Sequence, residues 1–215
     1  IRSLPGFIVK TIIDASIERL SIKSLVKRIM SIDPDIKYIG LTGNVYSAKF
    51  SLYSARMLKQ HFPNTTFIMG GAYATTMHEF VLRNNFVNIC VLGEGEFTLP
   101  ELLDTLDNHE DLEKVKGISF LKEGELITTP RRPYIEDLDS LPFPSWHLFP
   151  DLRKYKNLRG VLKRPYLPIF TTRGCPYGCI WCNKNIHGYR VRARSAENVV
   201  EEIKRDVKEF GVKEI

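Results

Sequence analysis

The chain has 215 residues, of which 43% are hydrophobic and 26% charged, and its formal net charge is +6 at pH 7. This composition is typical of folded domains and argues against intrinsic disorder. No apolar run approaches the roughly 20 residues that cross a bilayer, and the first residues do not resemble a signal peptide. We therefore expect a cytoplasmic protein without a membrane segment. Because the sequence opens at Ile1 and stops in an apolar stretch, we also expect it to be an excerpt of a longer protein.

The first part of the chain alternates between apolar, β-branched runs and segments with helical periodicity. The runs predict strands at 7–13, 36–41, 65–70 and 88–93. Apolar residues three or four positions apart predict helices after Ser21, over about 46–61, near 77–84 and over about 97–108. Such alternation requires a parallel sheet, because each helix returns the chain to the same end of the next strand. Residues 1–112 are therefore predicted to form an α/β, Rossmann-like domain.

Glycine occurs in each of the loops 42–44, 70–75 and 93–96, which follow the last three predicted strands, and in such sheets ligands bind beyond the carboxyl ends of the strands. Glycine permits a positive φ and lets a flat ligand approach the backbone, although a tight strand-to-helix turn is the alternative for each loop alone. The candidate ligand contacts are Thr42, Gly43, Asn44, Gly70, Gly71, Ala72, Gly93, Glu94, Gly95 and Glu96.

The last of these loops argues against a nicotinamide dinucleotide. Gly93 and Gly95 follow a strand, but Thr98 stands where a third glycine is needed. Glu94 and Glu96 would place negative charge where a pyrophosphate binds. A neutral or cationic ligand suits these carboxylates better, and capping of the next helix is the structural alternative for Glu96.

A connecting segment is predicted over residues 113–160. The runs 117–121 and 125–129, joined by Lys-Glu-Gly, predict a hairpin. Five prolines follow within residues 130–150, mixed with aromatic side chains. We expect this stretch to be an ordered strap that lies over a surface.

Residues 161–215 are predicted to begin a second β/α array, the start of a partial TIM-like barrel. A strand is expected at 166–172, a helix after Ser195, and the next strand at the end of the chain. The sequence RGCPYGCIWC then occupies the first loop after a strand, on the face where such barrels carry their chemistry.

Three of the four cysteines lie in this loop, at the spacing Cys175-x3-Cys179-x2-Cys182. Three thiolates so placed can hold three corners of a [4Fe-4S] cluster and leave one iron open for chemistry. Structural zinc with His187 as fourth ligand is the main alternative, and three metal-free thiols would be an oxidation hazard. Cys90 is expected to be a buried core residue.

Basic residues surround these cysteines. Residues 151–194 contain eleven Lys or Arg and one acidic residue. Attraction of an anionic ligand or nucleic acid and a solvated face that aids solubility are both open interpretations. On a strand, Arg190, Arg192 and Arg194 would share one side, where they can meet the carboxylates of a cofactor or substrate.

Together, these motifs resemble the radical S-adenosylmethionine superfamily. The cysteine spacing, with Trp181 directly before the last cysteine, is its most specific feature. The stretches GYRVRARSAENVVEEI, GGAYAT, GEGEFTLPELL and DLDSLPFPSW are similar to members that carry a cobalamin-binding domain upstream. The resemblance therefore extends over nearly the whole chain.

The resemblance implies that Cys175, Cys179 and Cys182 ligate a [4Fe-4S] cluster whose free iron binds S-adenosylmethionine, with Trp181 near the adenine. It implies a 5′-deoxyadenosyl radical, an electron donor such as flavodoxin or ferredoxin, and glycine loops that face the corrin of cobalamin. The expected reaction is methyl transfer to an unactivated carbon of a small molecule. Oxidation or cyclisation of a tetrapyrrole-like substrate is the alternative.

Two departures from the family pattern limit this interpretation. The string Asp-x-His-x-x-G, which supplies histidine to cobalt in some cobalamin domains, is absent, and its usual place precedes Ile1. Further S-adenosylmethionine contacts of the superfamily would follow Ile215. A nucleic-acid-binding module with structural zinc is the hypothesis from a different class, based on the basic stretch near Trp181 and Tyr189, and we do not favour nucleic acid as the partner.

Overall fold

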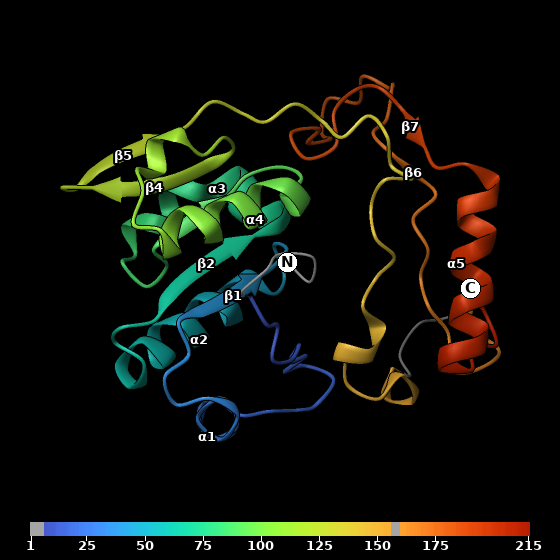
Figure 1. Ribbon diagram of the computed structural model, residues 1–215, viewed down its shortest axis with the longest axis horizontal. Helices are drawn as coiled ribbons and strands as arrows, with labels where there is room; N and C mark the ends of the chain where they lie inside the picture. The colour runs from blue at the N-terminus through green and yellow to red at the C-terminus, as the bar shows by residue number, and fades with distance from the viewer. Residues whose placement is uncertain (1–6, 156–159) are drawn as a thin grey trace.

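The structure is a computed structural model that describes residues 7–155 and 160–215. Figure 1 shows a sheet with its helices on one side of the molecule and the helix α5 (Ala196–Phe210) on the other. A long, mostly irregular strap runs from the sheet to the neighbourhood of α5 (Figure 1). Within the described ranges, no helix has the length and apolar character needed to cross a bilayer.

The sheet has five strands, and their order in space is their order in the chain. The strands β1, β2 and β3 are parallel, whereas β4 and β5 are antiparallel to their neighbours. The elements are α1 (Ile22–Ile32), β1 (Tyr38–Thr42), α2 (Ala48–His61), β2 (Thr66–Gly70), α3 (Gly71–Arg83), β3 (Ile89–Val91), α4 (Gly95–Asp107), η1 (Leu112–Lys114), β4 (Ile118–Lys122) and β5 (Glu125–Thr128). The predicted Rossmann-like α/β fold is confirmed.

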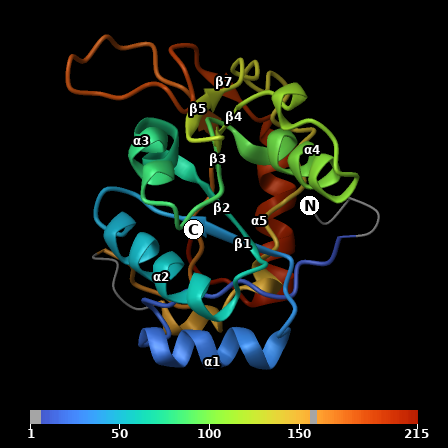
Figure 2. The same ribbon diagram turned by 90° about the vertical axis from the view of Figure 1, so that its left-hand side faces the viewer.

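Helices cover both faces of this sheet (Figure 2). Phe67 and Met69 of β2 pack with α1, α2 and α3, whereas Ile68, between them, packs with α4 on the opposite face. This alternation follows from the two-residue period of a strand. Cys90 of β3 is fully buried, as expected, and burial raises the pKa of its thiol to about 12.

The helix α1 shows how local signals define an element. Ser21 caps it, because its hydroxyl accepts a hydrogen bond from the N–H of Ser24 at 3.2 Å. Leu25, Val26 and Ile29 are the buried residues of its inner face. Cap and periodicity were both readable in the sequence, and the predicted helix is confirmed.

The predicted hairpin also forms, and it extends the sheet. Its turn places Glu123 and Gly124 at positive φ, 52° and 86°, as the tight turns between antiparallel strands require. Because β4 pairs with β3, residues 118–128 belong structurally to the sheet and not to the strap.

The strand predicted at 7–13 does not form. The N–H of Ile12 instead donates to the carbonyl oxygen of Leu148 at 3.1 Å, in the helical turn η2 (Trp146–Leu148). The β-branched pattern could not identify the partner of this segment, which lies in a distant part of the chain.

The segment GAYATT was expected to be a loop before a helix near 77–84, but α3 begins immediately at Gly71. A kink at Met77, with φ −118° and ψ 27°, divides the helix where the sequence pattern placed its start. The loop after β2 is consequently a single turn, with Gly70 as the extended residue before the helix.

The strap is ordered, as predicted. Ile135 and Leu138 are buried, and the carboxylate of Asp139 accepts the N–H of Ser195 at 3.0 and 3.2 Å. The ring of Phe143 lies 5.6 Å from the guanidinium of Arg194. The strap therefore contacts both the first residues of α5 and, as described below, the sheet.

The second part contains η3 (Leu152–Lys154), β6 (Thr172–Arg173), β7 (Arg192–Ala193) and α5. Most of the strand predicted at 166–172 is absent: Tyr166 forms an isolated parallel bridge with Glu214, and regular pairing begins only at Thr172. Pro168 lacks the N–H that a ladder needs, which interrupts pairing between these points. The bridge around α5 is the parallel arrangement expected at the start of a β/α array.

The helix α5 begins after Ser195, whose side chain accepts the N–H of Asn198, as the sequence predicts. Its buried residues are Glu202 and Asp206, whereas Val200 and Val207 are 45% and 51% exposed. The apolar stripe that identified the helix is therefore not its most buried face in this structure.

Candidate functional site

The loops after β1 and β2 emerge side by side, because Thr42 and Gly70 are register partners at the ends of two parallel strands. The N–H of Tyr73 donates to the carbonyl oxygen of Gly43 at 3.2 Å and links the two loops. Asn44 stabilises the first loop, since its side-chain oxygen accepts main-chain N–H groups of Tyr46 and Ser47 at 3.0 and 3.1 Å.

Glycine is required at one of these positions. Gly71 has a φ of +87°, and a Cβ there would lie 2.8 Å from the hydroxyl oxygen of Thr42. At Gly70 a Cβ would meet only ordinary contact, 3.9 Å from Val91, so this position leaves space at the sheet edge. With Gly43 and Ala72 beside them, these residues form an edge of small side chains, which fits the close approach of a flat ligand.

The loop after β3 contacts the second part of the chain. Gly93 has a φ of +75°, and its N–H donates to the hydroxyl of Thr75 at 3.0 Å. Glu94 precedes α4, and its side chain is only 3% exposed. Gly95 and Glu96 begin the helix, where Glu96 places its charge in the first turn.

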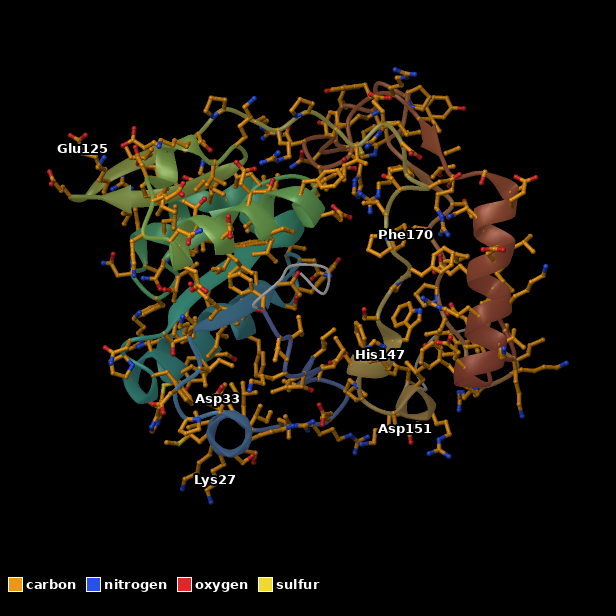
Figure 3. All side chains as sticks on the ribbon, in the orientation of Figure 1. Lys27, Asp33, Glu125, His147, Asp151 and Phe170 are labelled. Atoms are coloured by element: carbon orange, nitrogen blue, oxygen red, sulfur yellow. The ribbon has the colours of Figure 1, made fainter. Side chains whose placement is uncertain are left out.

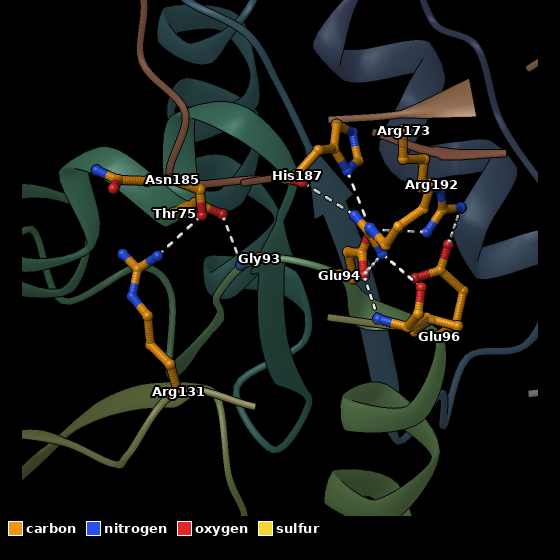
Figure 4. A network of polar contacts seen from close by, with 10 residues as sticks. Thr75, Gly93, Glu94, Glu96, Arg131, Arg173, Asn185, His187 and Arg192 are labelled. Carbon is orange, nitrogen blue, oxygen red and sulfur yellow. Dashed lines mark hydrogen bonds and ion pairs between the residues drawn. The ribbon is translucent and has the colours of Figure 1, made fainter. Parts of the chain in front are cut away.

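Glu94 is the centre of a buried polar network (Figure 4). The guanidinium of Arg192 donates to both carboxylate oxygens of Glu94, at 2.9 and 2.8 Å, and both side chains are 3% exposed. The N–H of Ile135 donates at 2.8 Å, Nδ1 of His187 lies at 3.2 Å, and Nη1 of Arg173 lies at 3.3 Å. Burial alone would raise the pKa of Glu94, but these donors outweigh it and lower the pKa to about 2.

This shift predicts an acid-sensitive contribution to stability. The folded pKa of about 2 lies below the ordinary 4.5, so the stabilisation is present above pH 4.5 and is lost as the pH falls through 2. The difference in unfolding free energy between wild type and Glu94→Gln should shrink by about 2 kcal/mol between about pH 6 and about pH 3, because only the upper part of the interval from 4.5 to about 2 lies in this range. Urea denaturation of the full-length protein from about pH 6 to about pH 3 measures it. A difference that stays constant over this range would contradict the assignment.

The cysteine loop lies between β6 and β7 and is mostly exposed. Cys179 and Cys182 are exposed, Cys175 is intermediate, and all three thiols are free. Trp181, which lies between Cys179 and Cys182 in the sequence, is 84% exposed. Within the loop, the ammonium of Lys184 donates to the carbonyl oxygen of Cys175 at 3.1 Å.

The three thiols are not gathered around one point. Over residues 7–155 and 160–215, no three His, Cys, Asp or Glu side chains lie close enough together to hold a metal ion. The donor set nevertheless fits an iron–sulfur cluster, because three free thiols within one eight-residue segment are the ligands such clusters use. The ligand assignment itself stays a prediction.

In this structure, the fourth ligand of the zinc alternative is engaged with a carboxylate. His187 lies on Glu94, and no Cys3His group occurs in the described part of the chain. The three arginines expected to share one side are also engaged elsewhere, each with its own carboxylate. Arg190 pairs with Glu136, Arg192 with Glu94, and Arg194 with Glu202.

These pairs show which functional residues the sequence analysis missed. The sequence analysis did not connect Arg173, Arg192 and His187 with Glu94, because 77 or more residues of sequence separate each of them from the loop of β3. One signal was available in the sequence: the loop of β3 is acidic, whereas the arginines lie in the basic stretch 151–194. Figure 3 shows that charged side chains line both parts of the molecule, so complementarity alone does not single out this pair.

Comparison with known proteins agrees with this arrangement. Residues 4–103 match the family described as B12 binding domain. The chain is 36% identical over 207 residues to an uncharacterized methyltransferase of Pyrococcus horikoshii, covering 95% of this chain and 43% of that protein. It is 31% identical over 194 residues to the anaerobic magnesium-protoporphyrin IX monomethyl ester cyclase of Synechocystis, covering 90% of this chain and 38% of that protein.

A solved structure is similar in fold as well. The cobalamin-dependent S-adenosylmethionine radical enzyme OxsB, with aqua-cobalamin and S-adenosylmethionine bound, superposes with a TM-score of 0.74 at 25% identity. The match covers 94% of this chain and 27% of OxsB. A B12-binding type of sheet joined to a cysteine loop defines the class, and the chain belongs to the radical S-adenosylmethionine superfamily with a B12-binding domain. It spans about two fifths of the length of the two curated relatives.

Proposed function

We propose that the full-length protein is a cobalamin-dependent radical S-adenosylmethionine enzyme that transfers a methyl group to an unactivated carbon of a small-molecule substrate. The observation that carries the proposal is the attachment of the cysteine loop to the carboxyl edge of the sheet through Glu94 and Arg192. A cluster on this loop and a corrin at the same edge would then lie in one active site. The methyltransferase from Pyrococcus horikoshii supports the choice of reaction.

The cluster ligands are Cys175, Cys179 and Cys182, and Trp181 lies beside the adenine. When bound, the cluster supplies the electron that splits S-adenosylmethionine into methionine and a 5′-deoxyadenosyl radical, and cobalamin supplies the methyl group. The chain's own work is to hold the loop, orient the substrate and exclude water. The exposed side chains of the loop are the groups that S-adenosylmethionine and the substrate would cover.

Cobalamin binds at the small-residue edge formed by the loops of β1 and β2. Its contacts are Thr42, Gly43, Asn44, Gly70, Gly71 and Ala72, with the backbone of Gly93, Glu94, Gly95 and Glu96 at the border. The carboxylate of Glu94 is not a contact in this proposal, because protein donors already surround it.

A cyclase is the second candidate. The relative from Synechocystis, a magnesium-protoporphyrin IX monomethyl ester cyclase, supports a tetrapyrrole-like substrate and an oxidative ring closure. The two candidates share the radical and differ in the product: a methylated carbon for one, a new ring without added carbon for the other.

The proposed partner is a one-electron donor such as flavodoxin or ferredoxin, because the cluster must be reduced before each cleavage. We place the protein in the cytoplasm, where thiols and clusters remain reduced. All four cysteines are free, as such a compartment requires.

Binding of cob(III)alamin by full-length protein tests the proposal. Wild type should retain the vitamin through gel filtration, whereas Gly70→Val should retain about tenfold less, since its side chain would project into the corrin site. Gly40→Val is the matched control, because Gly40 lies inside β1 and a Cβ there meets nothing within 4 Å. Equal retention by wild type and Gly70→Val, or no retention by wild type, would contradict the proposed site.

A further inference from the structure

Glu94 is the only member of the three glycine-containing loops whose side chain is buried against the second part of the chain, among the described residues. It lies in the loop after β3, next to Gly93, whose φ is +75°, and directly before α4. Its main chain is held in place by Thr75 of α3, which accepts the N–H of Gly93. The carboxylate therefore has a fixed position relative to the sheet.

Both ends of the cysteine loop meet this one carboxylate. Arg173 is the last residue of β6, before the cysteines, and Arg192 is the first residue of β7, after them. Both guanidiniums contact Glu94 in Figure 4, at the distances given above. Since β6 and β7 pair as a short ladder, Glu94 holds the stem from which the cysteine loop projects.

The same stem is tied down by two further contacts. Arg192 donates to the carbonyl oxygens of Ile135, at 2.6 Å, and His187, at 3.0 Å. Ile135 belongs to the strap and returns a hydrogen bond to Glu94 through its N–H. Sheet, strap and cysteine loop consequently share one set of donors and acceptors, at whose centre the side chains of Glu94 and Arg192 are buried.

The charges balance only when the two parts are in contact. Arg173 and Arg192 carry two positive charges, and Glu94 and Glu96 carry two negative ones; Glu96 pairs with Arg173 at 2.5 Å. A single buried charge without its partner is strongly unfavourable. A shift of the stem that separates Arg192 from Glu94 while both stay buried would leave a buried charge unpaired, which makes the contact position-specific.

We propose that Glu94 is a positioning residue that fixes the cysteine loop against the carboxyl edge of the sheet and thereby sets the separation of cluster and cobalamin. The effect on the separation of cluster and cobalamin rests on the proposed function, whereas the attachment of the cysteine loop to the sheet does not. The carboxylate of Glu94 touches neither cofactor, and its effect reaches them only through the stem.

The first test uses hydrogen–deuterium exchange in cofactor-free, full-length protein. In Glu94→Gln, the amides of Cys175 and Arg194, which donate to Gly188 and Thr171, should exchange at least about tenfold faster than in wild type. Amides of β2 should accelerate much less. Wild-type exchange throughout 172–194, or equal acceleration of β2 and the stem, would overturn the proposal.

A matched control carries the same chemical change outside the network. Glu101 of α4 also pairs with an arginine of the strap, Arg132, but its side chain is 42% exposed. Glu101→Gln should leave the stem amides at the wild-type rate, because an exposed ion pair contributes little. Stem acceleration in this control equal to that of Glu94→Gln would overturn a specific role for Glu94.

A second variant covers the case in which Glu94→Gln does not fold. Arg192→Lys keeps the buried positive charge but loses the planar fork that bonds both carboxylate oxygens. Its stem amides should again accelerate more than those of β2, and a wild-type pattern would overturn the proposal.

The second test uses the reconstituted holoenzyme. Pulsed electron paramagnetic resonance measures the dipolar coupling between the reduced cluster and cob(II)alamin. Glu94→Gln should bind both groups at wild-type stoichiometry and broaden the distance distribution. A wild-type distribution would overturn the positioning role. If no cofactor binds to wild type, the proposed function fails, whereas the exchange experiment still decides the attachment of the loop.

Discussion

Cys182→Ala should abolish the brown iron–sulfur absorbance of the anaerobically reconstituted, full-length protein. With two of three thiolates left, the cluster loses a corner ligand, and we expect iron content to fall at least about tenfold, together with 5′-deoxyadenosine formation. Because Cys182 is exposed, removing its sulfur leaves no cavity in a core. Iron and sulfide analysis beside the visible spectrum measures the loss.

Cys90→Ala is the control for the loss of one thiol. Cys90 is fully buried in β3, so its removal should cost about 1 kcal/mol of stability by leaving a small cavity, with iron content unchanged. Wild-type iron in Cys182→Ala, or a colourless wild type that holds stoichiometric zinc, would contradict the cluster assignment.

Elements defined by local chemistry were predictable from the sequence. The caps Ser21 and Ser195 lie at the starts of α1 and α5, where the apolar periodicity also begins. Gly124 marks the hairpin turn, and its positive φ is the reason for a glycine there. Each signal lies within a few residues of the element it specifies, so tertiary contacts were not needed to interpret it.

Elements that depend on distant partners were not predictable in the same way. The run 7–13 has strand composition, but Ile12 bonds to Leu148, more than a hundred positions away, and no pairing within the sheet occurs. The same limit explains the stripe on α5. Val200 and Val207 follow helical spacing, but the buried residues are Glu202, which pairs with Arg194, and Asp206, which pairs with Arg205.

In the candidate site, too, residues with local signals could be predicted and pairs of distant residues could not. The cysteines could be recognised because three ligands lie within one loop, and Gly71 because its turn is local. The ion pair between Glu94 and Arg192 could not be recognised, because 98 positions separate the two residues. In the sequence, a glutamate beside glycine is equally consistent with a ligand contact or a helix cap. The structure gives Glu94 a third role that neither alternative contained.

Gly174→Ala should disrupt the stem of the cysteine loop. Gly174 has a φ of +87°, and a Cβ there would lie 2.0 Å from the carbonyl oxygen of Arg190 and 3.0 Å from that of His187. Both obstacles are backbone atoms, which cannot rotate away as a side chain does, so the two arms of the loop must separate. We expect a loss of about 3–5 kcal/mol from the attachment of the stem, seen by chemical denaturation, and a parallel loss of iron on reconstitution.

Gly178→Ala makes the same substitution four residues away in the same loop. No atom lies within 4 Å of its added Cβ, and its φ is not in the left-handed range, so its stability should stay within about 0.5 kcal/mol of wild type. The pair separates two explanations of the glycine content of this loop. If general flexibility were the requirement, both variants would suffer alike, whereas the close approach of Gly174 to Arg190 predicts that only Gly174→Ala does. Equal behaviour of the two variants would contradict the geometry of the stem.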